Sequence, residues 1–360
     1  MDEKNSKESI IDFLSNIIDN NSFQDKDGKF SLTNNGPHGD SETYLRSTSH
    51  FLYLLCFLVE AGRQEYTIKA NLAADYLISK DARPMGGAYY CRFNPKKDFS
   101  NGLVGQAWVM ESLLYASKVL NRSDCRESVN NVFMKHLWND KLCAWHLLNV
   151  DGSSSPTPHG TFNQQVWFAY IGLQIEGNNQ ANSQARKFIK YTLPNVELYN
   201  DGVIYHDSPS YNVKSSITAF INHKIRSVFQ NSLKNKMRNK RNHSAAYHAF
   251  NLVPLKYMEE NVEDNFFESK KFIKAMNCFD SLKYIDDVGR SPYGLNYNPS
   301  GYEWAYVKKE NEALRNKFIK WQSESFVVDG RGKIEFNNSH DMFLSIARIY
   351  ELARVFRDCY

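Results

Sequence analysis

The chain has 360 residues, 42% of them hydrophobic, so it can bury a sizeable core as one large domain or two smaller ones. Its 44 Lys and Arg residues nearly balance its 40 Asp and Glu residues, and the net charge of +4 is too small to favour nucleic acid as a partner. The six cysteines are scattered without CxxC spacing, which indicates neither a zinc site nor a disulfide framework.

The first 21 residues, MDEKNSKESIIDFLSNIIDNN, are polar and acidic and lack the basic start and apolar stretch of a signal peptide. The most apolar run, FLYLLCFLVEA at 51–61, is too short to span a bilayer and contains Glu60. We therefore expect a reduced, cytoplasmic protein that does not insert into a membrane.

Apolar residues recur at helical spacing in about twelve segments, separated by loops rich in Gly, Pro, Asp and Ser. Twelve helices joined this way predict an all-α toroid, in which inner helices line a cavity and short β-hairpins lie in the loops. An open stack of helical pairs is the alternative, but there is no fixed repeat length as in a regular solenoid. We expect one domain over 1–360, with 1–40 as a peripheral segment. The helical segments are 8–20, 42–62, 66–80, 102–120, 124–138, 162–176, 180–192, 213–233, 243–260, 264–283, 302–322 and 339–357.

Aromatic residues are abundant, with 21 Tyr, 23 Phe and 6 Trp. Tyr and Trp combine a flat apolar face with a polar edge, and sugar rings stack on such faces. The composition fits either a sugar-binding cleft or a core that is simply rich in aromatics.

A first polar stretch, DFSNGLVGQAWVME at 98–111, opens a predicted inner helix. Asn101 can cap this helix, and the polar side chains after it could reach a cleft. They could equally be buried hydrogen-bond partners within the core. The candidates for the cleft are Asp98, Gln106, Trp108 and Glu111.

A second stretch, HGTFNQQVWFA at 159–169, places three consecutive amides before a tryptophan. Each buried amide without a partner costs roughly 1 to 3 kcal/mol, so a ligand or a hydrogen-bond network should meet them. We predict that residues 163–167 form one wall of a carbohydrate site. The binding candidates here are His159, Gln164, Gln165 and Trp167, and Asn163 is a candidate for the catalytic set.

A third stretch, HSAAYHAFNL at 243–252, follows the one dense basic run of the chain, LKNKMRNKRN at 233–242. Such a run is usually a solvated helix end. Its functional interpretation is a rim that attracts an anionic glycan.

The second and third stretches together resemble alginate lyases built on an α/α toroid. FNQQVWFA is similar to their Asn-Asn-His-x-Tyr-Trp motif, with Asn163 at the second Asn and Trp167 at the Trp. A catalytic Tyr follows in those lyases, in a Tyr-His context downstream of an Arg. Here Tyr247 and His248 follow Arg238 or Arg241 in that order.

The resemblance implies an acidic, uronate-containing sugar and proton abstraction from its C5 atom. That proton becomes acidic when the neighbouring carboxylate is neutralised, which Asn163, Gln164 and Arg241 could do. Tyr247 or His248 would then accept the proton. Protonation of the leaving oxygen by the same Tyr would complete β-elimination, whereas reprotonation on the other face would give epimerisation.

This sequence departs from the lyase motif at Gln164, which stands where the lyases have a histidine. An amide cannot act as a base, so the lyase mechanism does not carry over unchanged. The same group of toroids includes heparinase-type lyases, uronyl epimerases and hydrolases of unsaturated uronyl sugars. Residues 193–232 have the character of an insertion relative to this plan.

Two further candidates for sugar binding are Arg46 and His50, which lie one turn apart in SETYLRSTSH. A surface pair would have the same spacing. A lone histidine on a helix is also more often a satisfied structural residue than a base.

A glycoside hydrolase or glycosyltransferase on the same scaffold is the alternative, because hydrolysis needs two carboxyl groups across the scissile bond. The available carboxyl groups are Asp98, Glu111, Asp207 and Glu303. A non-catalytic toroid that binds a glycan or a protein is the third hypothesis. The sequence has no P-loop, dinucleotide GxGxxG, HExxH or GxSxG motif, so we expect no cofactor and no metal.

Overall fold

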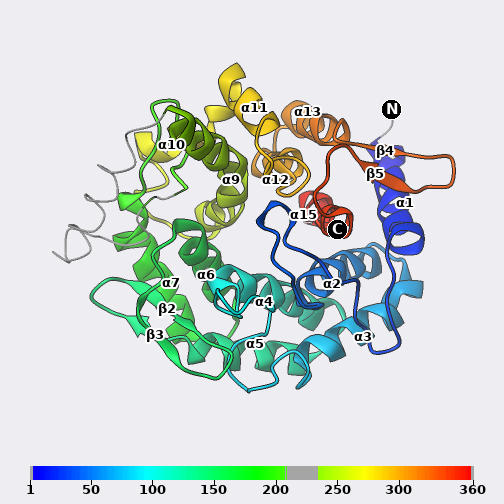
Figure 1. Ribbon diagram of the computed structural model, residues 1–360, viewed down its shortest axis with the longest axis horizontal. Helices are drawn as coiled ribbons and strands as arrows, with labels where there is room; N and C mark the ends of the chain where they lie inside the picture. The colour runs from blue at the N-terminus through cyan, green and yellow to red at the C-terminus, as the bar shows by residue number, and fades with distance from the viewer. Residues whose placement is uncertain (1–2, 207, 209–233, 358–360) are drawn as a thin grey trace.

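The structure is a computed structural model and describes residues 3–206, 208 and 234–357. Within these residues, six inner helices form a closed ring (Figure 1). Each packs on the next, and the last packs back on the first, which closes the ring. In ring order they are α2 (Leu45–Glu60), α4 (Gly102–Val119), α6 (Phe162–Gln174), α9 (Lys234–Asn261), α12 (Ser300–Val307) and α15 (Tyr350–Arg357).

The inner helices are hydrophobic on nearly every side because they are covered on nearly every side. Residues 45–59 of α2 and 102–116 of α4 are all buried. An outer helix such as α7 buries one stripe and keeps its polar residues in water. The outer helices are α1 (Glu3–Asn21), α3 (Thr67–Ile78), α5 (Ser123–Lys135), α7 (Asn179–Tyr191), α11 (Leu282–Gly289) and α13 (Glu312–Ser323). The predicted all-α toroid is confirmed.

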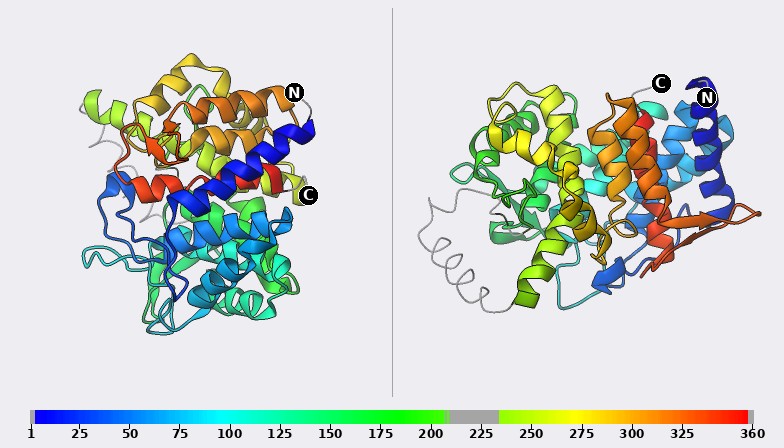
Figure 2. Two further views of the ribbon diagram at one scale, coloured as in Figure 1. Left: turned by 90° about the vertical axis from the view of Figure 1, so that its right-hand side faces the viewer. Right: turned by 90° about the horizontal axis from the view of Figure 1, so that it is seen from above.

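Short strands lie in the loops, as expected. β1 (Trp138–Asn139), β2 (Ala144–Leu148) and β3 (Ser154–Pro158) form an antiparallel sheet that leads into α6, with Trp138 opposite Trp145. β4 (Phe326–Val328) and β5 (Ile334–Phe336) form a second hairpin. Figure 2 shows this hairpin projecting beside α1, where Asn16 and Asn21 bond the backbone of Gly332.

Three predicted helices are in fact divided into shorter ones. Segment 302–322 divides into α12 and α13, because Asn311 caps a new helix by accepting the N–H of Leu314 (3.1 Å). Segment 339–357 divides into α14 (Met342–Ala347) and α15. Segment 264–283 contains α10 (Lys270–Met276), a turn of 3-10 helix (Cys278–Asp280) and the start of α11. Segment 213–233 lies outside the described residues.

No helix in the described part of the chain combines the length and apolar character needed to cross a membrane. Of the region 193–232, only 193–206 and 208 are described. These residues form a turn of 3-10 helix (Leu193–Asn195) and a small hairpin with Leu198 opposite Ile204.

Candidate active site

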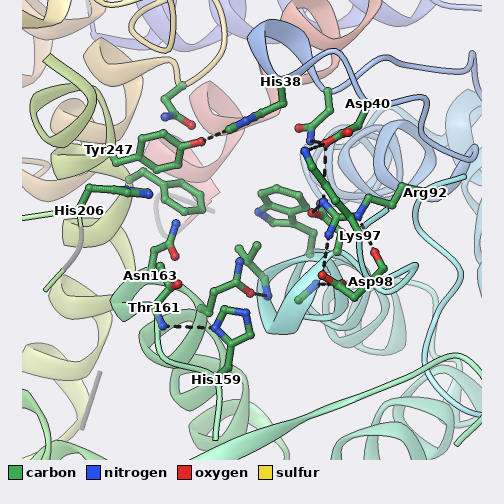
Figure 3. Close-up of a pocket in the computed structure, with 18 of the residues that line it drawn as sticks. His38, Asp40, Arg92, Lys97, Asp98, His159, Thr161, Asn163, His206 and Tyr247 are labelled. Atoms are coloured by element: carbon green, nitrogen blue, oxygen red, sulfur yellow. Dashed lines mark hydrogen bonds and ion pairs between the residues drawn. The ribbon is translucent and has the colours of Figure 1, made fainter. Parts of the chain in front are cut away.

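A cavity of about 300 Å³ lies among the inner helices and the loops that precede them (Figure 3). Its walls come from the loop before α2, the loop before α4, the starts of α4 and α6, the middle of α9 and the loop before α12. It is lined by Asn35, His38, Asp40, Arg92, Lys97, Asp98, Asn101, Gly102, Val104, Trp108, His159, Thr161, Asn163, Gln164, His206, Tyr247, Phe250, Tyr297 and Asn298.

A tyrosine and a histidine form a hydrogen-bonded pair in the upper wall of Figure 3. Tyr247 Oη lies 3.0 Å from His38 Nε2. Burial lowers the pKa of His38 to about 4, helped by the positive charges of Arg46 and Lys97, so its imidazole is neutral near pH 7. Burial also raises the pKa of Tyr247 well above its usual value, so the phenol keeps its proton. The pair therefore combines a neutral base with a neutral acid.

His38 is presented by a turn whose backbone is unusual. Gly36 has a φ of +52°, and a Cβ atom there would come within 2.5 Å of the ring of Tyr297. Asn35 also adopts a left-handed conformation, with a φ of 56°. The sequence NNGPHG thus allows the loop to pass close to Tyr297 and turn His38 toward Tyr247. The segment 1–40, which we expected to be peripheral, supplies part of the cavity wall.

His159 faces the cavity from the loop before α6 (Figure 3). Its Nδ1 accepts the backbone N–H of Thr161 (3.3 Å), so the neutral ring carries its proton on Nε2. Burial lowers the pKa of His159. This side chain presents an N–H donor across the cavity from Tyr247. His206 lies on the side of Tyr247, with its ring centroid 4.7 Å from that of Tyr247.

The amide of Gln164 connects α6 to the start of α4. Its Oε1 accepts the N–H of Val104 (2.8 Å). Gly102, at a φ of +65°, permits this approach, since a Cβ there would lie 2.2 Å from Gln164 Oε1. Asp98 accepts the N–H of Gly102 (2.7 Å). Asn101 occupies the cap position of α4 without capping it, because its side chain accepts from Arg92 (3.1 Å).

The charged residues of the cavity wall are paired with one another. Lys97 Nζ lies 2.5 Å from Asp40 Oδ2, and Arg92 Nη2 lies 2.6 Å from Asp98 Oδ2. Hydrogen bonds from Lys97 and Asn94 hold the pKa of Asp40 below its usual value, although burial opposes them. The two cations and two anions cancel, which leaves this wall without net charge.

In the wall, Asn163 Oδ1 and Trp108 Nε1 have no hydrogen-bond partner among the described residues. Both side chains are 6% exposed and both line the cavity. An unpaired buried polar group is costly in the unliganded protein. Both are therefore suited to a ligand with hydroxyl groups.

Arg46 stands behind the cavity rather than in its lining. Its Nη1 bonds Asn35 Oδ1 (2.7 Å) and Glu42 Oε1 (3.2 Å). Its guanidinium group lies 4.2 Å from the centre of the Trp108 ring and 5.0 Å from that of Tyr297. It thus orients two rings of the wall.

His248 and Arg241 do not line the cavity, contrary to our expectation. His248 is fully buried, and its Nδ1 accepts the N–H of Ile204 (3.1 Å) while its Nε2 lies 3.0 Å from the carbonyl of Ala275. Arg241 forms ion pairs with Asp201 (2.6 Å) and with Asp287 of α11 (2.7 Å). Both side chains fasten the hairpin around Leu198 and Ile204 to α9, and so position His206 at its end. The side chain of Arg238 is not among those described, and neither is Asp207.

Three other predicted residues belong to the core. Gln165 bonds both backbone groups of Trp145 (2.9 and 2.7 Å). Gln106 likewise bonds both backbone groups of Tyr89 (2.8 and 3.1 Å). Trp167 is fully buried and stacks on Phe250, which forms part of the cavity floor.

The predicted carboxyl groups Glu111 and Glu303 are buried inside the ring, each beside an arginine. Glu111 accepts hydrogen bonds from Arg354 (3.0 Å) and from Tyr170 (2.5 Å). Glu303 accepts one from Arg348 (2.7 Å), and burial raises its pKa to about 8. Neither lines the cavity.

His50 is also buried inside the ring. Its imidazole stacks on Tyr350 at 4.5 Å and meets Trp108 edge-on. Burial lowers its pKa well below the usual value. It supports the cavity wall from behind.

The sequence interpretation missed several residues of the cavity, among them His38, Arg92, His206 and Tyr297. They lie in loops, where no helical period indicates which way a side chain points. The turn sequence NNGPHG was the available signal for His38. Within the described ranges, no group of three or more His, Cys, Asp or Glu residues is arranged to hold a metal ion.

No family model matches the chain. It is 29% identical over 354 residues to "Archaeal glycosylation protein Q" of Haloferax volcanii, covering 93% of this chain and 94% of that protein.

Several solved structures have a similar fold. A D-mannose isomerase superposes with a TM-score of 0.59 at 14% identity, over 99% of this chain and 98% of the other. The cellobiose 2-epimerase of Spirochaeta thermophila gives 0.59 at 10% identity, over 100% of both chains. A GH76 α-mannanase of Bacteroides thetaiotaomicron gives 0.58 at 10% identity, over 98% and 96%. At such identities the likeness shows the shared α/α toroid alone.

Proposed function

We propose that this chain is a carbohydrate-active enzyme that moves a proton at a carbon atom of a sugar, as an isomerase or an epimerase does. The observation that carries the proposal is the hydrogen bond between Tyr247 and His38 in the cavity wall, with the donor His159 across the cavity. General acid–base catalysis needs such groups within reach of one bound molecule.

The chemistry requires a carbon-bound proton next to a carbonyl group. The Tyr247–His38 pair takes that proton, the electron pair forms a carbon–carbon double bond, and the Nε2–H of His159 protonates the carbonyl oxygen. In the second step one carbon atom of this enediol takes up a proton and one of its hydroxyl groups returns a proton to His159, which forms the carbonyl group again. Return of the carbon-bound proton by the same pair to the neighbouring carbon gives isomerisation. Return to the opposite face of the first carbon, after the enediol has turned in the cavity, gives epimerisation.

The charge balance of the wall favours a neutral sugar. The cations Arg92 and Lys97 are already matched by Asp98 and Asp40. Arg241, the expected partner of a uronate carboxylate, is engaged by aspartates outside the cavity. A uronate remains the second candidate, because Asn163 and Gln164 could bond a carboxylate as well as hydroxyl groups.

A glycoside hydrolase has less support. Asp98 accepts from Arg92, Ser100 and the N–H of Gly102. Asp40 accepts from Lys97 and Asn94, which leaves neither carboxyl group suited to donate a proton. Glu303 has the raised pKa of an acid but lies outside the cavity lining.

The similar proteins support a carbohydrate-active enzyme without deciding its reaction, because an α-mannanase shares the fold as well. The relative from Haloferax volcanii is named for glycosylation, and two proteins that share the fold are named as a mannose isomerase and a cellobiose epimerase.

The test is incubation of the protein in D₂O with neutral aldoses and, separately, with D-glucuronate. We expect deuterium on carbon, at C2 of an aldose, in recovered sugar and product. Elimination would instead leave an unsaturated uronyl end that absorbs in the ultraviolet, and hydrolysis of a glycan would release reducing ends without deuterium on carbon. Either result would overturn the proposal.

A further inference from the structure

A second pocket lies on the outside of the ring, away from the cavity. Its volume is about 420 Å³, within the range of about 300–1,000 Å³ that small-molecule sites occupy. Its lining residues come from the end of α5, the turn into strand β1, the residues that follow β1, and α7. It is lined by Met134, His136, Leu137, Trp138, Asp140, Gln180, Ser183, Gln184 and Lys187.

A fixed indole ring forms one side of this pocket. Trp138 is partly exposed, and its Nε1 donates to Asp140 (2.9 Å). Its ring packs edge-on against the buried Trp145, at 4.6 Å between centroids. These two contacts hold the ring in one orientation, so it can serve as a platform at little entropic cost.

A buried hydrogen-bond acceptor forms another part of the lining. His136 is 3% exposed, and its Nδ1 bonds the carbonyl of Val132 (3.1 Å). A carbonyl only accepts, so Nδ1 carries the proton of this neutral ring and Nε2 is an acceptor. That Nε2 has no partner in the part of the chain that is described. A buried acceptor of this kind calls for a donor such as a hydroxyl group.

Apart from Met134 and Leu137, the remaining lining is polar, and its two charges are paired with each other. Lys187 Nζ lies 2.9 Å from Asp140 Oδ1, so its charge is matched within the pocket. Gln184 uses its amide oxygen to accept from Trp145 (3.3 Å), which leaves its NH₂ group as the donor. Gln180 and Ser183 add an exposed amide and hydroxyl. Neutral donors and acceptors beside an aromatic face suit a polyhydroxylated ring and not an anion.

We propose that this outer pocket is a second carbohydrate-binding site, which takes one neutral sugar unit on Trp138 with a hydroxyl group directed to His136. The site is separate from the cavity and does not depend on the reaction proposed there. It would hold another part of a glycan on the outer wall of the ring.

The test uses methyl glycosides of glucose, mannose and galactose. Their rings cannot open to the carbonyl form, so the reaction proposed for the cavity cannot consume them. Binding is followed by saturation-transfer NMR and by the ¹⁵N shift of the His136 imidazole, with D-glucuronate and glucose 6-phosphate as charged probes. We expect at least one neutral glycoside to bind and to shift the His136 signal, and the charged probes to bind at least about tenfold more weakly.

Two variants of α7 locate the binding. Ser183→Trp places a large side chain in the pocket at an exposed helical position, so the protein should fold. It should weaken binding by about tenfold or more. Asn179→Trp puts the same side chain on the same helix outside the lining and should bind as the wild type does.

Trp138→Ala tests the platform and should also weaken binding by about tenfold. The proposal is overturned if no neutral glycoside binds, if Ser183→Trp binds as well as Asn179→Trp, or if the charged probes bind more tightly. Deuterium exchange at the cavity is measured on the same variants and should not change, so failure of this site is distinguishable from failure of the proposed reaction.

Discussion

The hydroxyl oxygen of Tyr247 lies 3.0 Å from Nε2 of His38, which joins residues 209 positions apart in the chain. With ordinary pKa values, Tyr247 would be a weak acid and His38 would be half-protonated near pH 6.5. Burial moves the two pKa values in opposite directions, so both groups stay neutral over the physiological range.

Tyr247→Phe should therefore reduce turnover by about 10²- to 10⁴-fold, the usual contribution of a general acid–base group. Stability should change little, because the ring and its packing are kept. Tyr66→Phe is the matched control, since it removes a hydroxyl that bonds Asp19 (2.8 Å) far from the cavity. Turnover is measured by steady-state kinetics and stability by thermal unfolding for both variants. Equal turnover in the two would contradict a catalytic role for Tyr247 and His38.

Asn163→Ala should weaken substrate binding without loss of stability. Its Oδ1 has no partner among the described residues, so truncation removes an unpaired polar group and not a hydrogen bond. We expect KM to rise while the melting temperature holds or increases. A clear drop in the melting temperature would indicate that the amide serves the fold.

Gln165→Ala should have the opposite effect, although it lies two residues away. Its amide bonds both backbone groups of Trp145 and the carbonyl of His159 (3.0 Å). Loss of these bonds should lower the free energy of unfolding by about 1–3 kcal/mol or more. Urea unfolding of the two variants side by side measures the contrast.

Glu111→Gln tests the hydrolase alternative. Glu111 is 2% exposed and paired with Arg354. Removing one partner of a buried pair costs about 3–5 kcal/mol, so the variant should be strongly destabilised. The fraction that folds should still catalyse proton exchange. If Glu111 were instead a catalytic acid, the variant would fold well and lose its turnover.

Glu303 should make stability depend on pH. Its pKa is raised to about 8 in the folded protein by burial, from about 4.5 when unfolded. The folded state therefore holds a proton that the unfolded state releases, and this stability is present below about pH 4.5 and lost as the pH rises through 8. Glu303→Gln cannot ionise. Relative to the wild type it should become more stable between pH 4.5 and 8, and a constant difference across that window would contradict the assigned shift.

The ring of helices could be predicted from the sequence, because the spacing of apolar residues along a helix reflects which of its sides are buried. Segments such as 51–59 are apolar on every side, which distinguishes an inner helix from the single stripe of α7. The breaks at Asn311 and before Tyr350 were missed, because a continued apolar period does not reveal a turn in the chain.

The cavity could be predicted only in part. Asn163, Gln164 and His159 line it as expected, and so does Tyr247. Gln165 points elsewhere because adjacent helical residues differ by about 100° in direction. Trp167 shares the face of Asn163 but lies one turn deeper. For His38, the sequence NNGPHG indicates a turn, but it does not indicate the contact with Tyr247, which lies 209 positions away.

The most direct test of the proposed reaction is the loss of the C2 label from a [2-²H]aldose to water, followed by NMR for the wild type, Tyr247→Phe and His159→Gln. The account predicts enzyme-dependent loss of label by the wild type and a fall of at least about 10²-fold in both variants. Retention of the label at C2 during turnover by the wild type would contradict it.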